Sequence, residues 1–346
     1  MNNVSEFSDV RVIPSLNRGK EEELVADYQT LSTLNFNLNT KFSDKCANDA
    51  KDILEKGKNP GLNIRKIHND GITGQGINVA IIDQPLLLEH SEYKDKVIKY
   101  KNFDEDGYEN ESSEHGPAVL SLLAGNNIGV APGVKVFYAA VPSWKKDMKY
   151  FEQALNWIIE ENNKLDELDK IKVVSISADP AYVGSFDNPE KYDEFLERWT
   201  KIEENAFQNN ILVISCTQNR YNILPGYLEL DTQDSIDEFK IGFPYSKNVS
   251  CNYNTLFVPS SKRTVAEMYE NEKESYSYEG PGGLSWGIPY LCGCLALGWQ
   301  INYNLTPDQI MNIIFETAKL VNDNIFIINP TNFIENVKTN QYAVKK

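Results

Sequence analysis

From about residue 76 onward, short apolar runs alternate with segments of helical periodicity, and this alternation constrains the fold more than any other feature. Residues 77–82 read INVAII, a β-branched run without a polar face. Three similar runs follow at 134–141 (VKVFYAAV), 172–177 (KVVSIS) and 211–216 (ILVISC). Runs of this kind are typical of strands buried on both faces of a parallel sheet.

Helical patterns separate and follow these strands. Apolar residues recur at helical spacing in the segments 115–124, 149–163, 190–209 and 285–300. A further helix is predicted after Thr306, which has the N-cap position with proline next and Gln309 three residues on. The alternation predicts an α/β protein with three layers, in which helices cover both faces of a largely parallel central sheet.

The first 60 residues differ from the rest. Glu21–Leu34 and Ser43–Lys56 have helical composition, and Asn59-Pro60-Gly61 then interrupts the pattern. We therefore expect a helical N-terminal extension over 1–60 and one catalytic domain over 61–346. The apolar segment 325–337 is expected to pack as a C-terminal element.

Charge and composition exclude several classes of function. The formal net charge of −16 argues against a nucleic-acid partner, because phosphate binding requires clustered lysine and arginine. The N-terminus lacks an apolar signal-peptide region, and no stretch reaches the roughly 18 apolar residues of a membrane span. The five cysteines have no disulfide or zinc spacing. These features predict a cytoplasmic protein with no membrane partner.

Residues 283–287 spell GLSWG, the G-x-S-x-G pattern of the α/β-hydrolase nucleophile elbow. In those enzymes the histidine follows the serine along the chain. Here the three histidines, His68, His90 and His115, all precede Ser285, so the elbow interpretation is excluded. The order acid, histidine, serine remains available, with Asp83 after the first strand and His115 and Ser285 each opening a helix.

Four segments carry a specific resemblance. They are GITGQGINVAIIDQP (71–85), HGPAVLSLLAG (115–125), GVAPGVKVFYAAV (129–141) and GLSWGIPYLCGCLAL (283–297). Their order, spacing and context resemble those of subtilisin-like serine proteases over about residues 71–300. The resemblance implies a subtilisin-like fold and a catalytic triad of Asp83, His115 and Ser285.

The same resemblance implies further roles. ILVISCTQN (211–219) resembles the segment with the oxyanion-binding asparagine, which makes Asn219 the expected donor. Substrate would lie extended along a strand edge that includes Ser175, Ser177 and Ala178. The implied activity is that of a serine endopeptidase acting on a peptide or protein, and we expect restricted processing. No cofactor is expected to be required and no metal ligand is predicted; relatives commonly hold structural calcium, but no ligand run places one here.

Several residues depart from the family pattern around these motifs. The departures are Gln84-Pro85, Pro117-Ala118, Asp179, Gln218, Leu284 and Trp286. They leave every expected catalytic atom in place but alter its surroundings. They keep open an alternative, a subtilisin-like pseudoprotease that acts as a binding or regulatory module. His90 is expected to be structural, and His68 is assigned no role.

Overall fold

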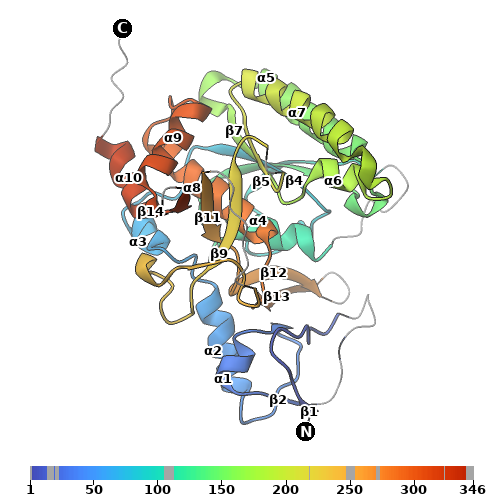
Figure 1. The fold of residues 1–346 in the computed structure, drawn as a ribbon, viewed down its shortest axis with the longest axis vertical. Helices are drawn as coiled ribbons and strands as arrows, with labels where there is room; N and C mark the ends of the chain where they lie inside the picture. The colour runs from blue at the N-terminus through green and yellow to red at the C-terminus, as the bar shows by residue number, and fades with distance from the viewer. Residues whose placement is uncertain are drawn as a thin grey trace.

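The computed structural model describes residues 2–13, 19, 23–104, 113–217, 219–246, 254–269, 273–322 and 324–339 (Figure 1). Its centre is a five-stranded sheet in the order β5-β6-β4-β7-β8, in which every neighbouring pair is parallel. The strands are β4 (Asn78–Asp83), β5 (Val97–Asn102), β6 (Lys135–Ala140), β7 (Ile171–Ile176) and β8 (Leu212–Ser215). The four predicted strands correspond to β4, β6, β7 and β8.

The strand order places β4 in the middle of this sheet with both faces buried. Val79 and Ile81 face one hydrophobic cluster, while Ala80 and Ile82 face another. Helices α4 (His115–Ala124) and α8 (Leu284–Ile301) contribute to the first cluster, and α5 (Lys149–Lys164) and α7 (Tyr192–Gln208) contribute to the second. Helices thus cover both faces, and the predicted three-layer α/β class is confirmed.

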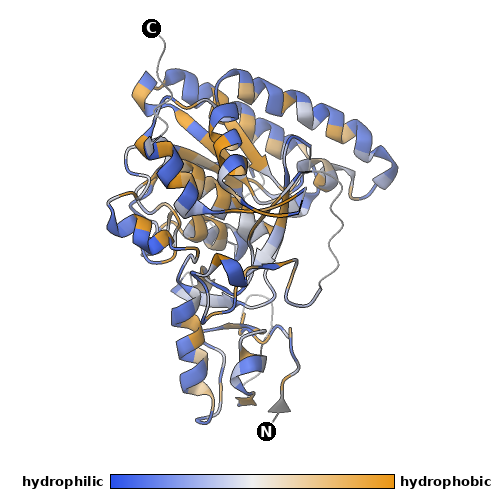
Figure 2. Cartoon of the chain, turned by 60° about the vertical axis from the view of Figure 1, so that its left-hand side comes forward, coloured by the Kyte–Doolittle hydropathy of each residue, from blue (hydrophilic) through white to orange (hydrophobic). Residues whose placement is uncertain are grey.

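The helices follow their sequence signals closely. Figure 2 shows alternating hydrophilic and hydrophobic residues along the long outer helices, as expected for helices with one buried face. Helix α9 (Pro307–Thr317) begins with a capping box, in which Thr306 Oγ1 accepts from the Gln309 backbone and Gln309 Oε1 accepts from the Thr306 backbone. The shorter helices are α3 (Ile64–Asn69), α6 (Pro180–Ser185) and α10 (Pro330–Thr339), with 3-10 turns at Ser143–Lys145, Glu167–Asp169, Pro189–Lys191 and Ile236–Glu238.

A second five-stranded sheet, in the order β10-β9-β11-β15-β14, follows the central one. Its strands are β9 (Asn222–Tyr227), β10 (Lys240–Ile241), β11 (Thr255–Pro259), β14 (Lys319–Asn322) and β15 (Ile325–Ile327). The C-terminal segment supplies β15 and α10, and Phe333, Ile334 and Val337 are buried against the main core. That segment therefore packs as expected.

The N-terminal extension is mixed in structure, and the expectation of a helical extension is only partly met. The predicted second helix corresponds to α2 (Ala47–Gly57), but the segment 21–34 contains only the short α1 (Tyr28–Leu31), preceded by strand β2 (Leu24–Val25); residues 20–22 lie outside the described part. Strand β2 pairs with β1 (Asn2–Asn3).

A third strand joins the extension to the rest of the molecule. Strand β3 (Asn35–Asn37) pairs with β13 (Lys273–Glu279), which in turn forms a hairpin with β12 (Arg263–Tyr269). Phe36 and Ile53 of the extension share a buried cluster with Leu230 and Tyr278. The extension is therefore packed onto the hairpin beside the core, as Figure 1 shows at the bottom of the molecule.

Four cysteines, Cys46, Cys216, Cys292 and Cys294, are free thiols, and Cys251 lies outside the described residues. Burial raises the pKa of Cys292 to about 12, so this thiol is protonated and unreactive at neutral pH. Within the described ranges, no helix has the length and apolar character needed to cross a membrane.

Candidate active site

Asp83 and His115 meet at the carboxyl end of the central sheet. Asp83 is the last residue of β4, and His115 is the first residue of α4. His115 Nδ1 lies 2.7 Å from Asp83 Oδ1, and the Gln84 backbone N–H also donates to this oxygen at 2.8 Å. The carboxylate side chain is 4% exposed, whereas the imidazole is 28% exposed. A buried carboxylate therefore orients a ring that solvent reaches from its other side.

The charge of Asp83 tunes this histidine. Burial alone would lower the pKa of His115, but the neighbouring carboxylate and its hydrogen bond outweigh burial, so the net pKa is raised. A histidine with a raised pKa and a fixed Nδ1 is a stronger base at Nε2. The pair has the electrostatics of a general base and its orienting acid.

Ser285 lies in the first turn of α8, at a loop that contains Gly282 and Gly283. Its hydroxyl donates to the Ser177 carbonyl oxygen at 3.1 Å, and the Ser177 hydroxyl donates to the Ser285 carbonyl oxygen at 2.8 Å. Trp286, the next residue, lies against His115 with 5.2 Å between ring centroids and 32° between ring planes. The structure thus brings the residue after Ser285 against the imidazole, while the Ser285 hydroxyl is turned towards the end of β7 and makes no hydrogen bond to His115 among the described residues.

Only part of the predicted substrate-binding strand edge lines a pocket. Ser177 and Ala178 line a mainly apolar pocket of about 330 Å³ that also contains Asp83 and His115. Ser175 does not reach this pocket, because its backbone is in register with both β4 and β8 and the residue is fully buried. The expected role of Ser175 is therefore corrected: of the three predicted residues, only Ser177 and Ala178, which follow the end of β7, line this pocket.

The structure does not bring Asn219 to Ser285. The Asn219 side-chain amide donates to Glu203 on α7, and its Oδ1 accepts from the Arg220 backbone at 2.6 Å. Asn219 and Arg220 line a separate pocket together with Glu203 and Glu204. Burial raises the pKa of Glu203, an effect that the Asn219 hydrogen bond partly offsets. The oxyanion role of Asn219 stays a prediction.

Other expectations concern the remaining histidines and metals. His90 is fully buried, with Nε2 3.1 Å from the Ser275 carbonyl oxygen, which is consistent with the structural role expected of it. His68 Nε2 lies 2.8 Å from the Val130 carbonyl oxygen. In the part of the chain that the structure describes, no group of three or more His, Cys, Asp or Glu side chains is arranged to hold a metal ion.

Two residues beside the site were missed by sequence reasoning. Ser113 Oγ accepts from the backbone N–H groups of His115 and Gly116 at 3.2 and 3.1 Å, so it holds the start of α4. Its position just before the helix was an available N-cap signal. Arg11, from the extension, hydrogen-bonds to Glu114 at 3.0 Å, and no local pattern indicated that contact.

Comparisons with known proteins agree with this architecture. A sequence model described as the subtilase family matches residues 74–237. The major intracellular serine protease of Bacillus subtilis is 25% identical over 255 residues, covering 66% of this chain and 69% of that protein. Subtilisin-like protease 3 of Pseudogymnoascus destructans is 23% identical over 292 residues, covering 82% of this chain and 66% of that protein.

Solved structures share the fold at low sequence identity. A solved structure of the subtilase cytotoxin SubAB aligns with this chain with a TM-score of 0.59 at 13% sequence identity. The alignment covers 82% of this chain and 96% of the solved one. The PatG macrocyclase domain aligns with a TM-score of 0.54, also at 13% identity, covering 80% and 94%. These matches make the chain similar to the subtilase family of serine peptidases along residues 74–237, and the solved structures share its fold.

Proposed function

We propose that this protein is a serine endopeptidase in which Ser285 is the nucleophile, His115 the general base and Asp83 the residue that orients the base. The observation that carries the proposal is the 2.7 Å contact of Asp83 with His115 Nδ1, together with the packing of Trp286, the residue after Ser285 at the N-terminus of α8, against the His115 ring. The helix dipole favours negative charge at this point.

The reaction requires Ser285 to change its hydrogen-bond partner. Its hydroxyl now donates to the Ser177 carbonyl oxygen. A substrate lying extended beyond β7 would offer a backbone N–H to that same oxygen and so displace the hydroxyl. A rotation about χ1 would then direct Oγ towards His115 Nε2.

The chemistry that follows is acyl transfer. Oγ attacks the peptide carbonyl carbon while Nε2 takes its proton, and the Asp83 carboxylate stabilises the imidazolium. The imidazolium then protonates the leaving amine as the C–N bond breaks, which gives the acyl-enzyme. Water, deprotonated by the same nitrogen, releases the acid and restores Ser285.

The developing oxyanion needs donors. The Ser285 backbone N–H belongs to the first turn of α8, where amide groups have no intrahelical acceptor. We propose Asn219 as the second donor, which requires its amide to leave Glu203.

The apolar pocket supports a narrow substrate range. Beyond Ser177 and Ala178, it is lined by the large side chains Trp144, Tyr182 and Phe186. We propose that an apolar side chain N-terminal to the scissile bond binds there, and that cleavage is restricted processing of a peptide or protein. We also propose a cytoplasmic location, supported by the free thiols and by the relative that is named an intracellular protease.

Labelling with a fluorophosphonate probe tests the nucleophile. The folded protein should be labelled and Ser285→Ala should not. The control Ser235→Ala, at the start of the 3-10 turn Ile236–Glu238 and outside the pocket that contains His115, should be labelled like the unmodified protein. Absence of labelling in the folded protein would refute the peptidase proposal.

One observation favours the alternative of a binding or regulatory module: the Ser285 hydroxyl and the Asn219 amide are both bound to other partners. In that case peptides would bind with no labelling and no cleavage. The labelling experiment therefore separates the two functions.

A further inference from the structure

A second pocket also borders His115. It has a volume of about 290 Å³ and shares Gln84 and His115 with the apolar pocket, but it contains neither Ser177 nor Ala178. Trp286 lines this second pocket but not the apolar one, and its indole packs against the His115 ring.

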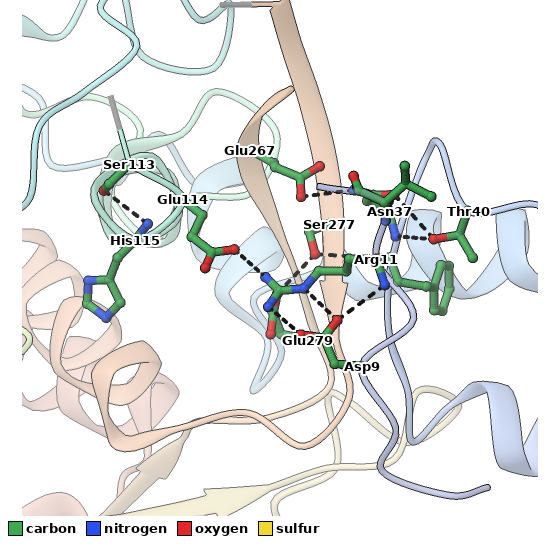
Figure 3. A network of polar contacts seen from close by, with 12 residues as sticks. Asp9, Arg11, Asn37, Thr40, Ser113, Glu114, His115, Glu267, Ser277 and Glu279 are labelled. Atoms are coloured by element: carbon green, nitrogen blue, oxygen red, sulfur yellow. Dashed lines mark hydrogen bonds and ion pairs between the residues drawn. The ribbon is translucent and has the colours of Figure 1, made fainter. Parts of the chain in front are cut away.

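Acidic side chains converge on this second pocket. Glu114 comes from the residue before α4, Glu267 from β12 and Glu279 from the end of β13. Figure 3 shows Glu114 and Glu279 beside Arg11, which belongs to the N-terminal extension, and Glu267 beside Asn37. We call Glu114, Glu267 and Glu279 the acidic triplet.

Arg11 pairs with two members of the triplet. Its Nη1 lies 3.0 Å from Glu114 Oε2 and 3.2 Å from Glu279 Oε1, while Nε and Nη2 bind Asp9 at 3.0 and 2.8 Å. The guanidinium side chain is 12% exposed and that of Glu279 is 7% exposed. The positively charged Arg11 of the extension therefore already occupies part of the pocket that His115 lines.

Glu267, the third member of the triplet, has one oxygen that could accept a further hydrogen bond. Glu267 is 3% exposed, and its Oε1 accepts from Asn37 Nδ2 at 3.1 Å. Its Oε2 is buried and makes no hydrogen bond of normal geometry within the described ranges, although the Ser275 hydroxyl is near enough to lower the pKa of Glu267 and so partly offset its burial. A buried carboxylate oxygen without a donor is unfavourable, so this oxygen is a site at which a cation would be stabilised.

Electrostatics favour a second cation. One guanidinium pairs with Glu114, Glu279 and Asp9, while the third carboxyl group of the triplet, that of Glu267, is bound to Asn37. Burial raises the pKa of Glu267 to about 7 and that of Glu279 to about 6, because it disfavours the ionised forms, and a second cation beside them would favour those ionised forms.

The position of the pocket indicates which part of a substrate it receives. The acyl half of a substrate extends past Ser177, on the side of the apolar pocket. The leaving amine must take its proton from His115, so the chain beyond that amine continues on the other side of the imidazole. The second pocket borders His115 but neither Ser177 nor Ala178, so it is the candidate for this side.

We propose that the acidic triplet is a subsite for a lysine or arginine side chain of the substrate, C-terminal to the scissile bond, with Glu267 Oε2 as its free acceptor. This proposal rests on the proposed function. Arg11 fills part of the same pocket and competes with the substrate cation for Glu114 and Glu279.

Binding to the inactive Ser285→Ala protein tests the subsite without any reaction. Calorimetric titrations would use L-argininamide and L-citrullinamide, which have nearly the same shape but differ in charge. Argininamide should bind at least about tenfold more tightly, because the charged form alone pairs with a buried carboxylate. Equal affinity for the two amides would overturn the proposal.

Variants of the pocket make the test specific. Adding Glu267→Gln should abolish the preference, whereas adding Arg11→Gln should increase it by removing the internal competitor. If Glu267→Gln does not fold, Glu114→Gln at the more exposed edge should reduce the preference instead. A preference that persists in both Glu variants would place the bound cation elsewhere and reject the subsite.

The leaving-group assignment has its own readout in the active protein. Acyl-enzyme formed from an ester substrate should transfer to argininamide in preference to citrullinamide. If argininamide binds selectively but transfer shows no preference, the pocket is not on the leaving-group side. Fluorophosphonate labelling reports on Ser285 independently, so failure of the proposed function and failure of the subsite are distinguished.

Discussion

The substitution Glu267→Gln should stabilise the folded protein, and the gain should grow with pH. The Glu267 carboxyl group is buried, and this burial raises its pKa from 4.5 to about 7. The folded state therefore holds a proton that the unfolded state releases between these values. The stability contributed by the neutral carboxyl group is fully present below about pH 4.5 and is lost as pH rises through about 7.

The structure gives the size of this effect. Each pKa unit corresponds to about 1.4 kcal/mol, so the ionised carboxylate costs about 3 kcal/mol well above pH 7 and under about 1 kcal/mol at pH 5. Glutamine has the same shape, keeps an oxygen for Asn37 and does not ionise. The difference in unfolding free energy between variant and unmodified protein should thus increase by about 2 kcal/mol from pH 5 to pH 8.

Urea denaturation at several pH values, followed by circular dichroism, measures this difference. Glu274→Gln on β13 is the matched control, because a hydrogen bond from the Ser91 backbone lowers the pKa of Glu274. The control should be slightly destabilised as pH rises, the opposite sign. A difference for Glu267→Gln that is independent of pH, or that falls with pH, would show that Arg11 already holds this carboxylate ionised and would refute the reasoning.

Three further predictions concern the site and the scaffold. Asp83→Asn should lower the labelling rate of Ser285 by about 10⁴-fold. It should also move the acidic limb of the rate profile to lower pH, because burial then lowers the pKa of His115 without the opposing carboxylate; an unmoved limb would contradict the pairing. Asn219→Ala should reduce peptide hydrolysis by about 10²–10³-fold, the loss typical of an oxyanion donor in this family, whereas an unchanged kcat would leave Asn219 bound to Glu203 throughout the reaction. Thr306→Ala should cost about 1 kcal/mol of unfolding free energy in thermal denaturation through loss of the cap, and an unaltered midpoint would show that the capping box contributes nothing.

The sequence by itself determined the central architecture. Strand β4 is buried on both faces because helices cover both. The sequence shows this burial as the largely apolar run INVAII at residues 77–82. The capping residues of α9 act within one helical turn, so their signal is also local. The order Asp83, His115, Ser285 excluded the α/β-hydrolase site, and each of these residues lies at the end of an element that the pattern had placed.

Tertiary structure decided the features that depend on distant partners. Strand β5 is a half-exposed edge strand, so its sequence lacks the continuous apolar run that revealed its neighbours. The short strand β3 exists because it pairs with β13, far along the chain. A sequence pattern reveals burial only where apolar residues recur regularly within one segment, and neither β5 nor β3 has such a regular recurrence.

The same limit applies to the chemistry of the site. The order of residues along the sequence indicated that Asp83 pairs with His115. The hydrogen-bond partners of the Ser285 hydroxyl and of the Asn219 amide depend instead on which acceptor is nearest in space. Charged residues such as Glu267 and Glu279 look exposed in a sequence, yet the fold buries them beside Arg11. Coulombic and hydrogen-bond energies depend on distances of a few ångströms, and only the folded chain fixes those distances.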